Sequence, residues 1–186
     1  MLKKSDITAR CKNNLIAYII LLVISAALVV LDQVSKHLIV LYLPKDAQIN
    51  VIPYLFNFTY VENKGAAWGM MANSRWIFII VSGIAVIALA GLLLYFAKSK
   101  KFLVSSLVLI FAGGIGNMID RTVNGYVVDF IQFDFFQKFP VFNVADSYVT
   151  IGGFMIIIYV LFIDRSFLSG KKKENGKENG NGNTEV

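Results

Sequence analysis

Four long apolar stretches constrain the fold of this 186-residue chain more than any other feature of its sequence. Three of them contain no charged residue, and the fourth contains one acid, Asp146, close to its start. A membrane-spanning helix needs about 17–25 predominantly apolar residues, and each stretch meets that length. The sequence therefore predicts an all-α membrane protein with four transmembrane helices. These helices should cover residues 15–31, 76–97, 102–119 and 145–163.

The first apolar stretch has the basic start of a secretory signal peptide, with Lys3, Lys4, Arg10 and Lys12 ahead of it. Its apolar run, however, is longer than the ~7–15 residues of a signal-peptide core. It is followed by Asp-Gln-Val-Ser-Lys at 32–36, where a cleaved signal would have a site of small residues. We therefore expect this stretch to be retained as a helix.

The basic residues predict the orientation of the helices. Charged residues are only 16% of the chain, and most of the 18 Lys and Arg lie in segments 1–14, 98–101 and 165–177. Cytoplasmic loops of membrane proteins carry an excess of Lys and Arg, so both termini and the short turn should be cytoplasmic. The connections 32–75 and 120–144 then lie outside. The net charge of +6 does not indicate nucleic-acid binding, because the basic residues form no stripe along a polar helix face.

The apolar stretches and the basic residues divide the chain into three segments. Residues 1–14 form a cytoplasmic N-terminal segment, and residues 15–165 form one membrane domain. Residues 166–186 are rich in Lys, Glu, Asn and Gly and carry almost no apolar side chain. Such a composition predicts a disordered cytoplasmic tail.

Both outer connections are rich in aromatic residues. Residues 52–60 place apolar or aromatic side chains at every even position, which predicts one strand with an aromatic face. The second connection carries six phenylalanines between 130 and 142. They form either an aromatic belt at the membrane interface, the interpretation favoured for most of these rings, or a flap over an apolar ligand.

Four acids are predicted to meet near the outer membrane surface. Asp32 ends the first stretch, Asp120 ends the third, and Asp146 begins the fourth. Asp129 lies in the connection between Asp120 and Asp146. Ionisable groups at membrane depth are costly and by default indicate a functional site.

Each acid also has a purely structural interpretation, favoured for Asp32 and Asp120 taken singly. Asp32 and Lys36 are spaced i, i+4, as in a helix-surface ion pair. Asp120 and its neighbour Arg121 could anchor a helix end at the headgroups. Asn143 and Asp146 match a helix capping box, a role that catalysis does not exclude. Asp129 is hardest to explain structurally, because its neighbours are apolar and such a setting raises the pKa of a carboxyl group.

Paired carboxylates are the strongest candidate catalysts in the chain. Two adjacent carboxyl groups share one proton, so one can activate water while the other donates to a carbonyl oxygen. Ser35 and Lys36 are adjacent on a helix and do not face each other. The lone Cys11 and lone His37 form no zinc or nucleophile cluster, so neither a metal nor another cofactor is expected. A proton-coupled transporter and a non-enzymatic membrane subunit are the weaker alternatives.

The glycines fall into two groups. Gly113, Gly114 and Gly116 lie within an apolar stretch and predict close helix packing. Gly65 and Gly69 lie in the first outer connection, where a glycine lets the backbone approach a ligand or simply forms a turn.

Five motifs now identify a resemblance that covers residues 15–165. They are DQVSK at 32–36, NKGAAWG at 63–69, GGIGNMIDR at 113–121, VVDF at 127–130 and FNVAD at 142–146. In this order, and on four predicted spans, they closely resemble the lipoprotein signal peptidases, or signal peptidase II. The resemblance implies a four-helix bacterial inner-membrane aspartyl endopeptidase with a small extracytoplasmic β-sheet. Such enzymes remove signal peptides from diacylglyceryl-modified prolipoproteins, cutting before the lipidated cysteine.

The resemblance also implies roles for individual residues. Its catalytic aspartates match Asp129 and Asp146, which agrees with the dyad chemistry, although the residues alone do not exclude Asp120. It implies that the enzyme acts as a monomer among membrane lipids, with its active site near the outer leaflet. The polar residues implied to bind substrate are Asp32, Lys36, Asn63, Gly65, Asn117, Asp120, Arg121 and Asn143.

Overall fold

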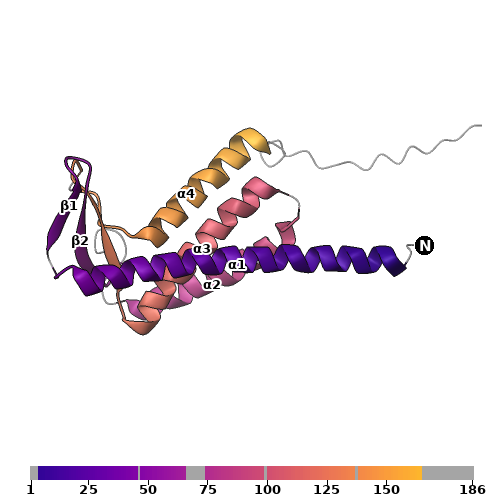
Figure 1. Cartoon of the computed structure of the whole chain (residues 1–186), viewed down its shortest axis with the longest axis horizontal. Helices are drawn as coiled ribbons and strands as arrows, with labels where there is room; N and C mark the ends of the chain where they lie inside the picture. Colours follow the sequence, from indigo (N-terminus) through magenta and orange to yellow (C-terminus); the bar gives the residue numbers. More distant parts are fainter. Residues whose placement is uncertain (1–3, 46, 66–73, 99, 137, 165–186) are drawn as a thin grey trace, which may run out of the picture.

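The computed structural model describes residues 4–45, 47–65, 74–98, 100–136 and 138–164, with side chains from Leu15 onward. Within these ranges it contains four α-helices, each long and apolar enough to cross a membrane (Figure 1). The four predicted transmembrane helices are therefore confirmed. The helices are α1 (Lys4–Tyr42), α2 (Arg75–Phe96), α3 (Lys101–Val123) and α4 (Val144–Ile158), which continues into the π-helical turn η2 (Tyr159–Ile163).

Helix α1 is longer than the sequence predicted. Its apolar part runs from Leu15 to Tyr42, over 28 residues, and does not stop at Asp32. Residues 32–42 contain no glycine or proline, and Pro44 is the first residue able to end the helix. Asp32 therefore lies inside α1, and the prediction that it ends the first span is wrong. At the other end, residues from Lys4 onward already belong to α1.

Helix α3 is the centre of the bundle, since it packs against α1, α2 and α4. Its glycines allow this approach. A Cβ atom at Gly113 would lie 2.4 Å from the Ala145 carbonyl oxygen on α4, and one at Gly116 would lie 2.4 Å from Asp32 Oδ2 on α1. Gly114 faces Val86 on α2. The packing role predicted for these glycines is confirmed.

Much of the helical surface is apolar and exposed. In α2 only Leu93 is buried, while side chains such as Ile87 on α2 and Phe162 in η2 are 74% and 70% exposed. Soluble monomers rarely expose apolar surface on this scale. The exposed helix faces are therefore suited to contact lipid.

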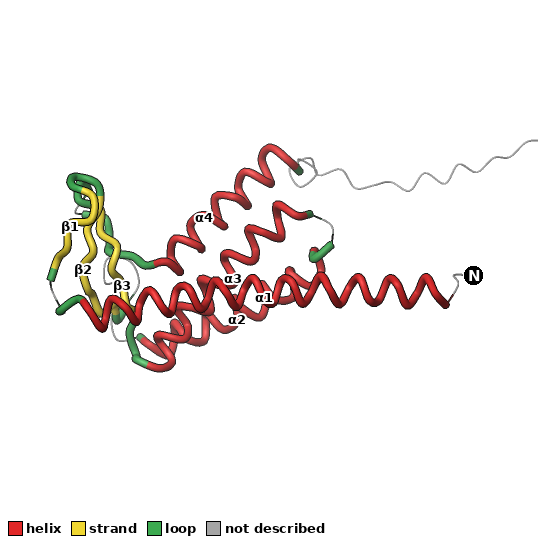
Figure 2. The backbone as a smooth tube through the Cα atoms, in the orientation of Figure 1, coloured by secondary structure: helices red, strands yellow, loops and turns green. Residues whose placement is uncertain are grey.

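A three-stranded antiparallel sheet lies at one end of the helices (Figures 1 and 2). Its strands are β1 (Gln48–Ile52), β2 (Phe56–Asn63) and β3 (Val127–Phe133), in the order β1-β2-β3. Since α2 and α3 separate β2 from β3 in the sequence, the sheet joins the two connections that were predicted to lie outside. Leu43, Tyr60, Val128 and Phe130 form its buried core.

The single strand predicted over residues 52–60 is wrong. A turn at residues 53–55 divides it into the end of β1 and the start of β2. Tyr54 has a positive φ of 66° and a side chain that is 86% exposed. Apolar side chains continue at every even position through this turn, so the pattern did not indicate it. Asn57 is also buried, and a register shift between Phe58 and Val61 interrupts the period of two.

Candidate active site

Asp129 lies on β3 between buried Val128 and Phe130, and it is only 2% exposed. Both of its carboxylate oxygens accept hydrogen bonds from side-chain amides. Asn63 Nδ2 donates to Oδ2 at 2.8 Å, and Asn143 Nδ2 donates to Oδ1 at 2.6 Å. The strand pairing sets this geometry, because Asn63 ends β2 directly opposite the start of β3.

Asp146 lies in the first turn of α4 and closes a capping box. Its backbone nitrogen donates to Asn143 Oδ1 at 2.9 Å, and its Oδ2 accepts from the Asn143 backbone nitrogen at 3.3 Å. Its Oδ1 accepts from Asn117 Nδ2 on α3 at 2.7 Å. The predicted cap is confirmed, and the same carboxylate also lines a cavity.

The three amides around the two acids have fixed orientations. Asn63 Oδ1 accepts from the Gly65 nitrogen, and Asn143 Oδ1 accepts from the Asp146 nitrogen. Asn117 Oδ1 accepts from Lys36 Nζ at 3.0 Å. Each amide oxygen is therefore occupied, so each NH₂ group is turned toward a carboxylate.

The electrostatics of Asp129 favour a retained proton. Burial and the nearby charge of Asp146 raise the pKa of Asp129 to about 7, although the Asn63 and Asn143 hydrogen bonds act in the opposite direction. Among the described residues, no lysine or arginine forms an ion pair with either Asp129 or Asp146. Two carboxyl groups with neutral partners and a shared proton can perform acid–base chemistry near neutral pH.

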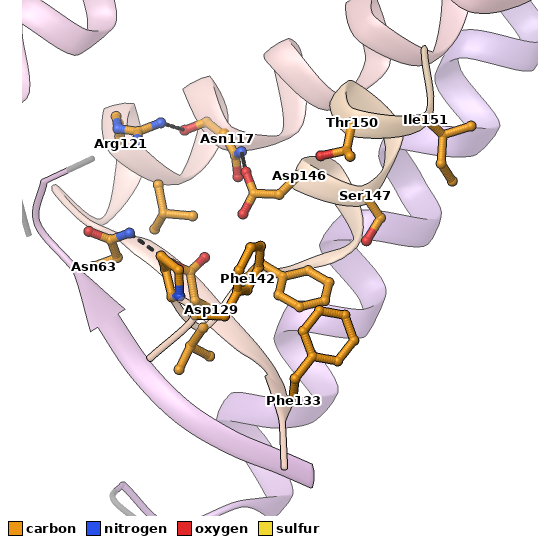
Figure 3. Close-up of a pocket in the computed structure, with 14 residues that line it drawn as sticks. Asn63, Asn117, Arg121, Asp129, Phe133, Phe142, Asp146, Ser147, Thr150 and Ile151 are labelled. Atoms are coloured by element: carbon orange, nitrogen blue, oxygen red, sulfur yellow. Dashed lines mark hydrogen bonds between the residues drawn. The ribbon is translucent and has the colours of Figure 1, made fainter. Parts of the chain in front are cut away.

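The two acids face a common cavity of about 460 Å³ (Figure 3). Asp129 reaches into it from β3 and Asp146 from α4. One wall is polar and contains Asn63, Asn117 and Arg121. Another is aromatic, with Phe133, Phe139 and Phe142, so part of the expected interfacial belt lines the cavity instead. The remaining lining residues are Val127, Pro140, Val141, Ser147, Thr150 and Ile151.

A second group of predicted site residues lies behind this cavity. Lys36 Nζ is 2.9 Å from Asp32 Oδ2 and 3.0 Å from Asp120 Oδ2, and all three residues are at least 97% buried. We call these three residues the ionic cluster. The Asp32–Lys36 ion pair predicted from the i, i+4 spacing is present, but it is buried and does not lie on a helix surface. The headgroup anchor predicted at Asp120 is wrong, because Asp120 is buried beside the same lysine. None of the three lines the cavity described above.

The ionic cluster connects the elements that carry the two acids. Asp32 Oδ1 accepts from the Ala145 nitrogen at 2.9 Å, at the start of α4. Asp120 Oδ2 accepts from the Val128 nitrogen at 3.2 Å, next to Asp129 on β3. Lys36 reaches Asn117 and, through it, Asp146. The cluster thus sets the relative positions of α1, α3, β3 and α4.

Comparisons with known proteins identify the family of this chain. Residues 24–162 match the family described as signal peptidase (SPase) II. The chain belongs to the signal peptidase II family. A lipoprotein signal peptidase of Streptococcus thermophilus is 43% identical over 135 residues, which are 71% of this chain and 86% of that protein. One of Staphylococcus aureus is 40% identical over 141 residues, which are 75% and 86%.

Solved structures show the same fold. A bacterial membrane enzyme determined by the in meso method at 2.3 Å resolution has a TM-score of 0.69 and 38% identity, covering 84% of this chain and 94% of that chain. A second such structure, at 1.9 Å, has a TM-score of 0.68 and 39% identity, covering 77% and 93%. This member of the signal peptidase II family is therefore a multi-pass membrane protein and an aspartic endopeptidase. Membership supports cleavage of lipoprotein signal peptides.

In this signal peptidase II, Arg121 is directed into the cavity wall and not toward headgroups. Its Nη1 donates to the Asn117 carbonyl oxygen at 3.4 Å and its Nη2 to the Gly65 carbonyl oxygen at 3.3 Å. The Phe78 ring lies 4.9 Å from its guanidinium carbon, a cation–π contact. Gly65 is buried beside the site, whereas Gly69 lies outside the described residues.

Sequence reasoning missed several residues of the site. Gln33 Nε2 donates to Asp32 Oδ2 at 3.1 Å and to Asp120 Oδ1 at 3.0 Å, so it bridges both acids of the ionic cluster. Ser147 and Thr150 add hydroxyl groups to the cavity. Thr150 could have been found from its spacing, because it lies one helical turn after Asp146. The contact of Gln33 with Asp120 joins residues 87 positions apart, so it leaves no local signal.

Proposed function

We propose that this enzyme removes signal peptides from diacylglyceryl-modified prolipoproteins and cuts before the lipidated cysteine. Asp129 and Asp146 are its catalytic dyad. The observation that carries this proposal is that two acids reach one cavity beside the membrane helices, with amide partners and with no ion pair to any residue that the structure describes. This arrangement leaves the carboxyl groups free to exchange a proton with water and with the peptide.

The reaction is a metal-independent hydrolysis. One carboxylate takes a proton from a water molecule, whose oxygen attacks the scissile carbonyl carbon. The other carboxyl group, protonated, donates a hydrogen bond to the carbonyl oxygen, and a tetrahedral diol forms. The carbon–nitrogen bond then breaks, the proton passes to the cysteine nitrogen, and the signal peptide leaves with a new carboxyl group. The raised pKa of Asp129 makes it the better candidate for the protonated member at neutral pH.

The surrounding polar residues hold the dyad and the peptide. Asn63, Asn117 and Asn143 orient the two carboxyl groups through their fixed amides. Arg121 uses two contacts to bind carbonyl oxygens of its own chain, and its remaining N–H groups are placed to bind peptide carbonyls in the cavity. We propose that Asp32, Lys36 and Asp120 act through these residues and do not touch the substrate.

The proposed setting is the bacterial inner membrane. Residues 15–165 form the catalytic domain, with the dyad near the outer leaflet and residues 1–14 and 166–186 in the cytoplasm. Substrate enters laterally from the lipid, because the diacylglyceryl group and the signal helix are both apolar. One copy of the chain suffices, since both acids and all three amides come from the same chain.

The test is cleavage of a purified, diacylglyceryl-modified prolipoprotein by the wild type, Asp129→Asn and Asp146→Asn, with mass spectrometry of the product. The wild type should release a peptide ending at the residue before the cysteine, and both variants should be inactive. Asp134→Asn is the matched control, because Asp134 bonds to Asn57 outside the cavity and should remain dispensable. Cleavage by both dyad variants at the wild-type rate would refute the dyad, and an inactive wild type would refute the substrate.

A further inference from the structure

Helix α4 presents two distinct faces. Its core face contains Ala145 and Gly152, both buried against α3. A Cβ atom added to Gly152 would lie 2.7 Å from the Ser106 carbonyl oxygen, so this face is closely packed. Tyr159, at the end of the helix, continues the same buried side.

The other face begins at a catalytic candidate and remains open. Asp146, Thr150, Gly153 and Ile157 follow at spacings of four, three and four residues, which aligns them along one side of a helix. Thr150 is exposed and lines the cavity next to Asp146 (Figure 3). Ile157 is 53% exposed. We call these four residues the open face of α4.

Gly153 differs from its neighbour Gly152 in a way that packing within the chain does not explain. A Cβ atom at Gly153 would meet nothing within 4 Å, although one at Gly152 would collide with α3. Glycine in a helix interior is destabilising relative to alanine by roughly 0.5–1 kcal/mol. The missing side chain leaves room beside the helix, directly below the cavity wall formed by Thr150 and Ile151.

The proposed substrate has a segment that fits this position. The residues before the scissile bond lead into an apolar signal helix, which must remain in the membrane beside the enzyme's helices. A bond held between Asp129 and Asp146 therefore directs these residues along α4, away from the sheet. The cavity of about 460 Å³ lies toward the small end of the usual range for ligand sites, about 300–1,000 Å³.

We propose that the open face of α4 is the subsite for the last residues of the signal peptide. Thr150 limits the size of the side chain immediately before the scissile bond, and Gly153 admits the backbone one turn deeper. This inference rests on the proposed function and adds a determinant of its specificity. Thr150 is a specificity residue and takes no part in the proton transfers.

The test uses diacylglyceryl-modified substrates that differ only in the residue before the cysteine, which is glycine, alanine or valine. Thr150→Leu should lower kcat/KM for the alanine and valine substrates about tenfold more than for the glycine substrate, the discrimination expected for a methylene or two. Thr150→Val keeps the volume and should preserve the wild-type order. Thr150→Ala should improve cleavage of the valine substrate.

A second pair of variants tests the deeper contact. Gly153→Leu should raise KM for all three substrates, whereas Gly91→Leu on α2 should not, although both glycines have open surroundings. The inference would be overturned if Thr150→Leu discriminated among the three substrates as the wild type does, or if Gly153→Leu and Gly91→Leu had equal KM values. Either result would leave the proposed function intact. A wild type that cleaves none of the three substrates would refute the proposed function, and the subsite with it.

Discussion

The ionic cluster and the proposed catalytic dyad each contain two aspartates, and all of these except the half-buried Asp146 are buried. In the cluster, Asp32 and Asp120 both contact the same ammonium group, that of Lys36, and they also accept backbone N–H groups. In the dyad, the hydrogen bonds that described residues donate to Asp129 and Asp146 come from side-chain amides and one backbone N–H. The dyad lines the cavity of about 460 Å³, whereas none of the cluster residues does, although Lys36 and Asp120 border a separate cavity of about 290 Å³.

This difference shows how one residue type serves two purposes in neighbouring positions. In the cluster, both acids share one cation and accept backbone N–H groups, so they hold secondary structure in place. In the dyad, the described residues form no ion pair with either acid. Burial and the charge of Asp146 raise the pKa of Asp129 to about 7, although its amide partners and the charge of Lys36 act in the opposite direction. We expect changes to the cluster to act first on stability and changes to the dyad to act first on catalysis.

Lys36→Met should give the largest loss of stability. It removes the only cation in contact with Asp32 and Asp120 among the described residues and leaves two carboxylates buried together. Breaking a buried ion pair by removing one partner typically costs about 3–5 kcal/mol. Thermal unfolding in detergent measures the effect. Lys45→Met is the control, because its ion pair with Glu62 is largely exposed and worth about 0–1 kcal/mol. Equal melting temperatures for the two variants would contradict the comparison.

Gly116→Ala should disturb the cluster without changing its charges. The added Cβ would lie 2.4 Å from Asp32 Oδ2, so α1 or Asp32 must move. Overpacking of this kind costs about 1–3 kcal/mol. Gly91→Ala is the matched control, since its Cβ meets nothing within 4 Å and alanine favours a helix. Unfolding measurements that find Gly116→Ala as stable as Gly91→Ala would show that the close approach is unimportant.

The pH dependence of stability and of cleavage tests the part of the comparison that concerns the dyad. The pKa of Asp129 is about 7 in the folded enzyme, above its ordinary 3.8, so the folded state binds this proton more tightly than the unfolded state. Its contribution to stability is complete below pH 4 and is lost as the pH rises through 7. Catalysis needs the shared proton, so kcat/KM should fall about tenfold per pH unit above neutrality.

A pH profile of cleavage from 5 to 9, with melting temperatures over the same range, measures both effects. The melting temperature of Asp129→Asn should depend less on pH than that of the wild type. A cleavage rate that stays constant up to pH 9 would argue against a shared proton at Asp129.

Asn143→Ser should change the pH profile of cleavage only slightly. It separates the role of Asn143 as a helix cap from its hydrogen bond to Asp129. Serine still caps α4, but it no longer donates to Asp129 Oδ1. That hydrogen bond lowers the pKa of Asp129, so its loss should move the falling part of the pH profile to higher pH. The shift should be less than about one pH unit, because a net hydrogen bond is worth about 0.5–1.5 kcal/mol. An unchanged profile would mean that Asn143 serves only as a cap.

The sequence was sufficient for the parts of the fold that depend on local composition. The four apolar stretches predicted the four helices, and Gly113 and Gly116 predicted close packing within α3. The capping box of Asn143 and Asp146 was also evident, since its spacing is local. The four acids were predicted to converge from the ends of the apolar stretches, although Asp32 lies inside α1 and Asp129 lies on β3.

Long-range contacts and turns were beyond this reasoning. The burial of Asp32 depends on Asp120 and Ala145, which are far away in the sequence. The turn at Tyr54 carries none of the glycine or asparagine that usually marks a positive φ, so the apolar alternation extended through it. The cavity is lined by residues of β2, α3, β3 and α4 together, so its aromatic wall had no local signal, although Thr150 had one in its spacing from Asp146.

The most direct test measures cleavage and thermal stability of Asp129→Asn in the same preparation at pH 8, beside wild type and Lys36→Met. Cleavage should fall by at least about 10²–10⁴-fold, the usual contribution of one acid–base group. The melting temperature should stay close to that of the wild type, while that of Lys36→Met falls. An Asp129→Asn variant that cleaves at nearly the wild-type rate, or that unfolds as easily as Lys36→Met, would contradict the division between a structural cluster and a catalytic dyad.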